Sequence, residues 1–293
     1  MMIFLPYYTR LIVLTSSDIA RQVANSHSLF NILNTIIFLP FIKPYTRFIQ
    51  WIMPYAKDET AAAEQETKYL DWNLLEASPA AGVDAVRKEM VHMGGVALRM
   101  IKTCHTIVLE RDWEKIPDVF AAEEIINKMT NDIVKYATEV GQRVHNPGLS
   151  TLLNSCVSGV GDIERIGDHG ENIAEMAKIM DEHKLKFSGK AAAECKEMFD
   201  TVIEAVEKSL RALESEKPEL AEEARALEKK TDEMERTLRA RHIERLNSGK
   251  CRPEVGVIFI DLLSNLERVA DHANNIALIV RDIQMVHNKQ AVI

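Results

Sequence analysis

A segment that occurs twice constrains the fold of this chain more than any other feature of its sequence. Residues 164–174 read Glu-Arg-Ile-Gly-Asp-His-Gly-Glu-Asn-Ile-Ala, and residues 267–277 read Glu-Arg-Val-Ala-Asp-His-Ala-Asn-Asn-Ile-Ala. Seven of the eleven positions are identical, and three of the four differences exchange similar residues. A repeat this close indicates that one structural unit is used twice.

Each copy has the pattern of an amphipathic helix, in which residues four apart lie on the same face. One face carries oxygen-bearing side chains, namely Glu164, Asp168, Glu171 and Glu175 in the first copy and Glu267, Asp271 and Asn274 in the second. The opposite face is apolar in both copies. We therefore expect two core helices, each with a stripe of carboxylates on its outer side.

Composition favours an all-α fold, because the 293 residues include only 12 Gly and 9 Pro and long segments are rich in good helix formers. Turn and capping signals divide the chain into predicted helices at 83–110, 117–144, 149–182, 189–215, 218–247 and 253–286. The repeated segment lies on the third and the sixth of these helices. The sequence therefore predicts a six-helix bundle over 83–287, built from tandem three-helix repeats at 83–182 and 189–287.

The second helix of each repeat also aligns, since residues 123–129 match residues 228–234. This alignment pairs Glu123 and Asn127 with Glu228 and Asp232, so each helix places two oxygen-bearing side chains four residues apart. Two carboxylates at that spacing repel each other by a few tenths of a kcal/mol. A Lys or Arg from a neighbouring helix is one possible compensation. The duplication favours a shared cation, and hard oxygen ligands suit magnesium, manganese, calcium or iron.

His169 and His272 lie beside the stripes, about 100° around the helix from them. This position favours a structural or hydrogen-bonding role over direct metal ligation. Asn172 and Asn275 have two possible roles, either orienting a ligand or bonding to a neighbouring helix. A ferritin-like metalloenzyme requires Glu-x-x-His facing the bundle core, and no nucleophile with a partnered base is apparent, so we expect no enzymatic activity.

Residues 1–56 differ from the rest of the chain in charge. They hold four of the basic side chains against the single acid Asp18, although the whole chain carries a formal net charge of −8. The acidic remainder argues against nucleic acid as a partner, because phosphate binding depends on Lys and Arg. The four cysteines are widely spaced, which predicts reduced thiols rather than a zinc site or disulfides.

The apolar run from Leu29 to Ile42 is shorter than the ~20 residues that span a bilayer. We expect residues 1–56 to form a short or broken membrane segment and an interfacial stretch, followed by a linker at 57–82. Tyr45, Trp51 and Tyr55 would be interfacial aromatics, with Lys43 and Arg47 on the cytoplasmic side. The alternative is a hydrophobic helix that packs on a soluble bundle.

The two Glu-Arg-(Ile/Val)-(Gly/Ala)-Asp-His segments resemble the paired signature of the PhoU family, which is built from two three-helix repeats and regulates bacterial phosphate uptake. Some members bind multinuclear metal clusters, notably of iron, on Glu/Asp-x-x-x-Asp pairs. The resemblance implies two metal sites, one at Glu123, Glu164 and Asp168, and one at Glu228, Asp232, Glu267 and Asp271. Asn127 replaces the expected Asp, so the first site has one charge fewer.

Residues 24–35 resemble the last membrane segment of bacterial sodium/phosphate cotransporters, which often carry a PhoU-like domain at their carboxyl end. The transport core of that family, with its Gln-Ser-Ser segments, has no counterpart here. The resemblances imply a PhoU-like regulatory domain at the cytoplasmic face of the cell membrane, with a phosphate transporter core as partner and iron, manganese or magnesium as cofactor. The alternative is a stand-alone, soluble PhoU-type regulator whose N-terminal stretch packs on the bundle or directs formation of a homodimer.

Overall fold

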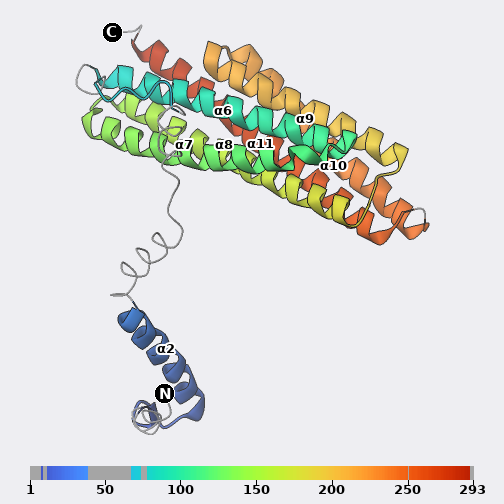
Figure 1. The fold of residues 1–293 in the computed structure, drawn as a ribbon. Coiled ribbons are helices and arrows are strands. Elements are labelled where there is room, and N and C mark those ends of the chain that lie inside the picture. Colours follow the sequence, from blue (N-terminus) through green and yellow to red (C-terminus); the bar gives the residue numbers. More distant parts are fainter. Residues whose placement is uncertain (1–7, 9–11, 39–66, 74–77, 250, 291–293) are drawn as a thin grey trace. The chain divides into compact units, whose positions relative to one another are not determined.

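The structure of the chain is a computed structural model that describes residues 8, 12–38, 67–73, 78–249 and 251–290. Every regular element in these ranges is helical, which confirms the predicted all-α fold (Figure 1). The α-helices are α2 (Ile19–Phe38), α6 (Pro79–Glu110), α7 (Ile116–Arg143), α8 (Pro147–Glu182), α9 (Gly189–Ser215), α10 (Pro218–Asn247) and α11 (Pro253–Gln290), and the 3-10 turn η2 (Trp113–Lys115) precedes α7. The chain divides into two compact units, Met1–Ala63 and Glu64–Ile293.

The first unit contains α2, which begins directly after a polar stretch that ends at Asp18. The Tyr8 hydroxyl donates a hydrogen bond of 2.5 Å to the backbone oxygen of Ser26 on this helix. Among the helices in the described ranges, none combines the length and the apolar character needed to cross a membrane. The predicted interfacial aromatics Tyr45, Trp51 and Tyr55, together with Lys43 and Arg47, lie outside the described residues.

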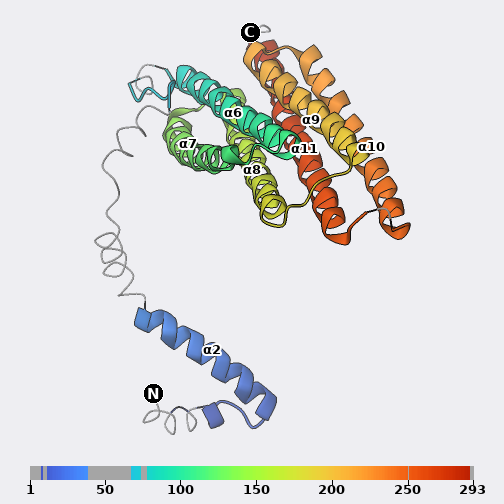
Figure 2. The same cartoon turned by 45° about the vertical axis from the view of Figure 1, so that its right-hand side comes forward.

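The second unit consists of two three-helix groups that pack side by side (Figures 1 and 2). Helices α6, α7 and α8 contact one another, and so do α9, α10 and α11. The two groups meet where α8 packs against α11 and where α6 packs against α9. Side chains from both groups also belong to one hydrophobic core. This arrangement confirms the predicted pair of three-helix repeats.

The helix ends follow from local chemistry, as the sequence predicted. Helices α9 and α10 have the predicted bounds, and the first three helices of the bundle begin one to four residues earlier than predicted. Asn146 caps α8, because its side-chain oxygen accepts hydrogen bonds from the backbone N–H groups of Gly148 and Leu149 at 2.8 and 3.2 Å. The Ser188 hydroxyl caps α9 in the same way by accepting from Ala191.

The apolar faces of the two repeated helices form the centre of the bundle. Ile163 and Ile173 of α8, and Leu266 and Ile276 of α11, are all fully buried. They belong to one hydrophobic cluster that includes side chains from both repeats. Burial of each such side chain stabilises the fold by roughly 1.5–3 kcal/mol. The predicted orientation of both amphipathic helices is therefore confirmed, and it leaves their acidic faces on the outside.

The predicted linker at 57–82 differs from the structure at its carboxyl end. Helix α6 begins at Pro79, with Ser78 in extended conformation immediately before it. The Ala-rich and Gly-containing stretch that suggested a linker is therefore the first turn of a helix, since Pro is well suited to a first helical position. Residues 57–66 lie outside the described part of the chain.

Residues 67–73 lie against the bundle. The buried carboxylate of Glu89 on α6 accepts hydrogen bonds from the backbone N–H groups of Lys68 and Tyr69, at 2.8 and 2.6 Å. The Tyr136 hydroxyl on α7 donates to the backbone oxygen of Asp71 at 2.9 Å. Because a buried carboxylate is costly without partners, these bonds both satisfy Glu89 and fix the segment.

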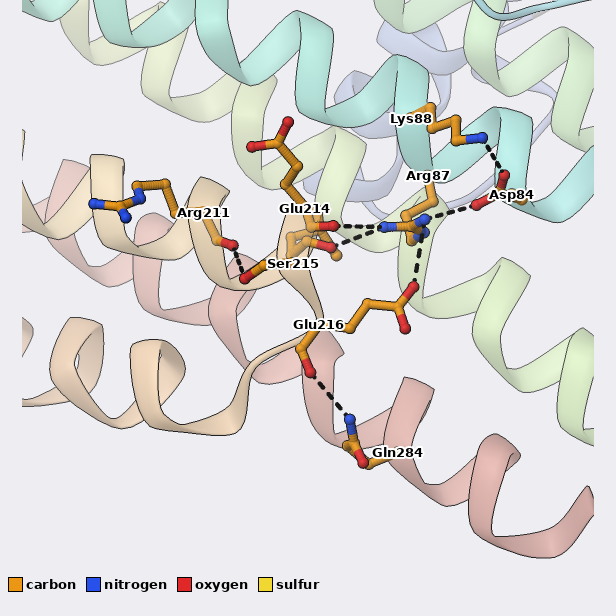
Figure 3. A network of polar contacts seen from close by, with 9 residues as sticks. Asp84, Arg87, Lys88, Arg211, Glu214, Ser215, Glu216 and Gln284 are labelled. Carbon is orange, nitrogen blue, oxygen red and sulfur yellow. Dashed lines mark hydrogen bonds and ion pairs between the residues drawn. The ribbon is translucent and has the colours of Figure 1, made fainter. Parts of the chain in front are cut away.

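Arg87 of α6 joins the two repeats at the end of α9 (Figure 3). Its guanidinium donates to the backbone oxygens of Leu213 and Glu214, at 2.9 and 3.4 Å, and forms an ion pair with Glu216 at 3.3 Å. The last carbonyl groups of a helix lack partners within it and carry partial negative charge. Arg87 therefore satisfies the end of α9 from the first repeat.

Candidate metal centre

The acidic side chains predicted for the second site come together between α10 and α11. Carboxylate oxygens of Glu228 and Asp232, on α10, and of Asp271, on α11, all lie within 4.8 Å of one another. Each of these side chains is half-buried. Glu267, one turn before Asp271 on α11, is also half-buried. We call these four residues the α10–α11 acidic cluster.

Burial and mutual repulsion raise the pKa of three carboxyl groups in this cluster. The pKa of Asp271 is raised by burial and by the charge of Asp232. That of Glu228 is raised by burial and by Asp232 and Asp271. That of Glu267 is raised by burial and by Asp271, Asp232 and Glu235. The cluster therefore holds more negative charge than its surroundings balance.

Asn274 supplies a separate indication of a missing partner. It lies three residues after Asp271 and belongs to the predicted polar stripe of α11. Its side-chain oxygen is buried and accepts no hydrogen bond from the described residues. A buried acceptor without a donor costs about 1–3 kcal/mol. Together with the crowded carboxylates, it gives this region the oxygen-rich donor set that a hard cation requires.

The residues predicted for the first site lie at the equivalent positions of α7 and α8, but their charge balance differs. The pKa of Glu123 is raised by burial, by the charge of Glu171 and by that of Asp168, while a hydrogen bond from Asn127 acts in the opposite direction. The Asn127 amide donates that bond directly to the Glu123 carboxylate. One of the acceptors available to a cation is therefore already occupied by the amide.

Arg165 balances part of the charge in the first site. Its guanidinium donates to Asp168 at 2.9 Å and lies 3.8 Å from the carboxylate of Glu164. Glu123 lies on α7, and Glu164 and Asp168 lie on α8. The structure does not bring these three carboxylates into a close group. Within the described ranges, only the second site brings three potential metal ligands within 4.8 Å.

The two histidines of the repeated segment lie in the contact between α8 and α11. The Nδ1 atom of His169 is 2.9 Å from the side-chain oxygen of Asn265, and that of His272 is 2.8 Å from the carboxylate of Asp162. The two rings stack at 5.7 Å between centroids. Burial lowers the pKa of His169. Both rings therefore join the two repeats, as expected for the structural role.

The asparagines that follow the histidines also bond across this contact. The Asn172 amide donates to Asn265 at 3.2 Å, and the Asn275 amide donates to Asp162 at 2.9 Å. Of their two predicted roles, the structure shows the bond to a neighbouring helix. Each histidine and asparagine thus share one oxygen acceptor from the opposite repeat.

Four residues that contribute to these sites and to the nearby helix contact were not among the predicted ligands. Asp162 and Asn265 lie seven positions before the histidines of their own copies, on the same helix face, so the repeat itself carried the signal. Glu171 was in the predicted stripe but not among the predicted ligands. Glu235 lies just outside the aligned segment, and Arg239 forms an ion pair with it.

Comparison with known proteins relates both halves of the bundle to one family. The family model for the PhoU domain matches residues 90–177 and 195–280, one match in each repeat. A phosphate-specific transport system accessory protein, PhoU homolog 1 from Thermotoga maritima, is 32% identical over 160 residues, which is 54% of this chain and 68% of that protein. The PhoU homolog of the same system from Pseudomonas putida is 27% identical over 203 residues, 68% of this chain and 78% of the relative.

Two solved structures share the fold. The crystal structure of PhoU from Pseudomonas aeruginosa aligns with a TM-score of 0.65 at 24% identity and covers 68% of this chain and 95% of that one. The phosphate transport system regulatory protein PhoU from Streptococcus pneumoniae aligns with a TM-score of 0.63 at 16% identity. The alignment covers 69% of this chain and 95% of that one. At these identities the likeness is one of fold.

Proposed function

Because the chain belongs to the PhoU family, we propose that it regulates phosphate transport as a PhoU-type accessory protein. The observation that carries this proposal is the family match in both repeats. Both similar curated proteins bear the name of accessory proteins of a phosphate-specific transport system. This favours the stand-alone regulator, the alternative of our two predictions, over the regulatory domain of a sodium/phosphate cotransporter.

The α10–α11 acidic cluster is the proposed metal site of this regulator. Glu228, Asp232, Glu267 and Asp271 would hold the ion, and their oxygen ligands suit iron, manganese or magnesium. Burial and mutual repulsion raise the carboxyl pKa values in the cluster, and a bound cation would offset the repulsion. It would also connect α10 to α11 and so stiffen the second repeat.

We infer that the regulator contacts the cytoplasmic side of a membrane-bound phosphate transport system. The N-terminal unit offers a way to reach the membrane, since α2 exposes Val23, Phe30 and Ile32. Fractionation of cells that express the full chain tests this. Retention in the membrane after a high-salt wash supports an apolar attachment, whereas release into the wash contradicts it.

Complementation tests the regulatory function directly. The full chain would be expressed in a bacterium that lacks its own PhoU, and uptake of radioactive phosphate would be measured in phosphate-rich medium. We expect the wild-type chain to reduce the excess uptake. A variant with Asp232→Asn and Asp271→Asn should lose most of this effect, and a matched variant with Lys190→Gln should keep it. Unchanged uptake with the wild-type chain, at normal expression, would contradict the proposal.

A further inference from the structure

A small cavity lies at the end of the second repeat, away from both acidic sites. It has a volume of about 260 Å³ and forms where α10 ends, where α9 and α11 begin, and where the connection after α8 passes. Arg245 lies 13 residues beyond Asp232 on α10, which corresponds to roughly 20 Å along a helix. The lining residues are Lys186, Phe187, Ser188, Ala191, His242, Arg245, Cys251, Arg252 and Val255.

The lining of this cavity has an unusual charge for this protein. The chain has 44 acidic and 36 basic side chains, yet the lining includes Lys186, Arg245 and Arg252 and no carboxylate. Helices α9 and α11 both begin here, at Ser188 and next to Arg252. The beginning of a helix carries partial positive charge. Two carboxylates next to the lining are paired with it, since Glu194 binds Arg245 and Glu254 lies 3.6 Å from Nε of Arg252. Lys186 and the helix beginnings add positive potential to these two ion pairs.

Arg245 provides a buried donor that has no acceptor. Two of its nitrogens bind the carboxylate of Glu194, at 3.0 and 2.7 Å, and one of these also lies 3.0 Å from Nδ1 of His242. Its third nitrogen, Nε, is buried and has no hydrogen-bond partner among the described residues. A buried N–H without an acceptor costs about 1–3 kcal/mol. This donor, on a side chain that lines the cavity, fits an oxygen ligand.

The protonation of His242 is fixed by the same arginine. Because an arginine can only donate, Nδ1 of His242 accepts, and the neutral ring carries its proton on Nε2. Burial and the neighbouring Arg245 lower the pKa of His242, which favours this neutral form. Nε2 lies 3.7 Å from the sulfur of Cys251. The ring thus adds a polar N–H to one wall of the cavity.

The fold itself does not require these polar groups. In the alignment of the repeats, His242 and Arg245 correspond to Ala137 and Val140 on α7, both of which are buried. Arg252 corresponds to Leu149 at the start of α8. The first repeat therefore builds the same helix ends with apolar side chains. At these aligned positions, the cationic side chains occur only in the second repeat.

We propose that this cavity binds a small tetrahedral oxyanion, either inorganic phosphate or the phosphoryl group of a phosphate ester. Lys186 supplies charge, Arg252 adds a guanidinium whose exposed ion pair with Glu254 is weak, Arg245 supplies the unpaired N–H, and the beginnings of α9 and α11 add their dipoles. The volume fits a phosphoryl group and is below the range of pockets for drug-sized ligands, about 300–1,000 Å³. This site goes beyond the proposed function, because it involves neither the metal nor the transport partner.

Calorimetric titration of the full chain with inorganic phosphate tests the proposal, with a chelator present and the ionic strength held constant. We expect saturable binding to the wild-type protein and an affinity at least tenfold weaker in the variant with Lys186→Gln and Arg252→Gln. The control is Lys190→Gln, an exposed lysine four residues further along the chain that does not line the cavity. It removes a nearby charge and should leave the affinity unchanged. Thermal unfolding would establish that all variants are folded.

Two outcomes would overturn the proposal: no saturable phosphate binding to the wild-type protein, or equal affinity in the wild-type and doubly substituted proteins. Titration with glycerol 3-phosphate separates the two sources of the ligand, since the free ion and the ester should differ in affinity. The variant with Asp232→Asn and Asp271→Asn should bind phosphate as the wild type does. Loss of binding in that variant would place the phosphate at the acidic cluster and contradict the cavity site.

Discussion

The two repeats place acidic residues at equivalent positions, yet the resulting sites differ in charge balance. In the second repeat, Glu228, Asp232 and Asp271 crowd together and repel one another. In the first repeat, Asn127 donates to Glu123, and Arg165 forms an ion pair with Asp168. The comparison teaches that duplication conserves the helix faces, whereas one amide and one arginine contact decide whether a site is left with unbalanced charge.

Substitutions that remove carboxylate charge should produce the largest difference between the two sites, and the difference is in metal affinity. We expect Asp232→Asn with Asp271→Asn to weaken metal binding about 100-fold, or ~2.7 kcal/mol, because two charged ligands are lost. The matched variant in the first repeat, Glu123→Gln with Asp168→Asn, should weaken it less than about threefold. Metal content after dialysis against manganese or iron, measured by mass spectrometry, gives the result. Equal losses in the two variants would remove the distinction between the sites.

The second largest difference should be in stability, between matched substitutions in the contact of α8 with α11. Asp162 accepts hydrogen bonds as a carboxylate, whereas the equivalent Asn265 accepts as a neutral amide. Hydrogen bonds to charged groups contribute more to stability than neutral ones. We expect Asp162→Ala to lower the free energy of unfolding by about 2 kcal/mol and Asn265→Ala by about 1 kcal/mol. Urea unfolding of both variants tests this, and a larger loss for Asn265→Ala would contradict it.

Conversion of the first site into a likeness of the second should produce a smaller gain. Asn127→Asp restores the missing carboxylate, and Arg165→Gln releases Asp168 from its ion pair. Together they should raise metal affinity at the first site about tenfold, or ~1.4 kcal/mol. The measurement is a manganese titration in the background of Asp232→Asn and Asp271→Asn, so that only the first site reports. No gain in affinity would show that charge balance does not explain the difference.

The pH dependence of stability should show the smallest effect. The folded-state pKa of Asp271 is raised above its ordinary value of 3.8. Protonated Asp271 therefore stabilises the metal-free fold below that pH, and the contribution is lost as the pH rises through the raised value. Above this range, Asp271→Asn should stabilise the metal-free protein by a few tenths of a kcal/mol, given the partial exposure of the group.

Asp168→Asn is the matched control for this effect. It removes a carboxylate that has an ion pair with Arg165, so it should give no gain in stability at any pH. Thermal unfolding in the presence of a chelator, from about pH 3.5 to pH 7, covers the window in which Asp271 loses its proton. Stabilisation of both variants to the same degree would contradict the proposed difference in charge balance.

Much of the fold could be predicted from the sequence because local signals determine it. Turn and capping signals gave the correct starts of α9 at Gly189 and of α10 at Pro218. The period of apolar residues placed Ile163 and Leu266 in the core, where the structure has them. Residues 67–73 were less predictable, because their position depends on Glu89, a partner about 20 residues away that no local pattern indicates.

The candidate sites could be predicted only in part from the sequence. The sequence indicated the carboxylates and the charge missing at Asn127. It could not distinguish Arg165 from Arg268, since both occupy the same position in the repeated segment. In the structure Arg165 forms an ion pair with Asp168, while no such pair joins Arg268 to Asp271. The cationic cavity was also beyond prediction, because its residues come from three separate stretches of chain.

The sequence by itself determined the all-α fold, the two repeats and the faces on which the acidic residues lie. These properties follow from periodicity and capping, which act over a few residues along one helix. Only the tertiary structure decided that the second acidic site is crowded, that Arg165 balances part of the charge of the first, and that Arg245 has a buried donor without an acceptor. Those properties depend on distances between side chains of different helices, which packing sets and a linear pattern does not contain.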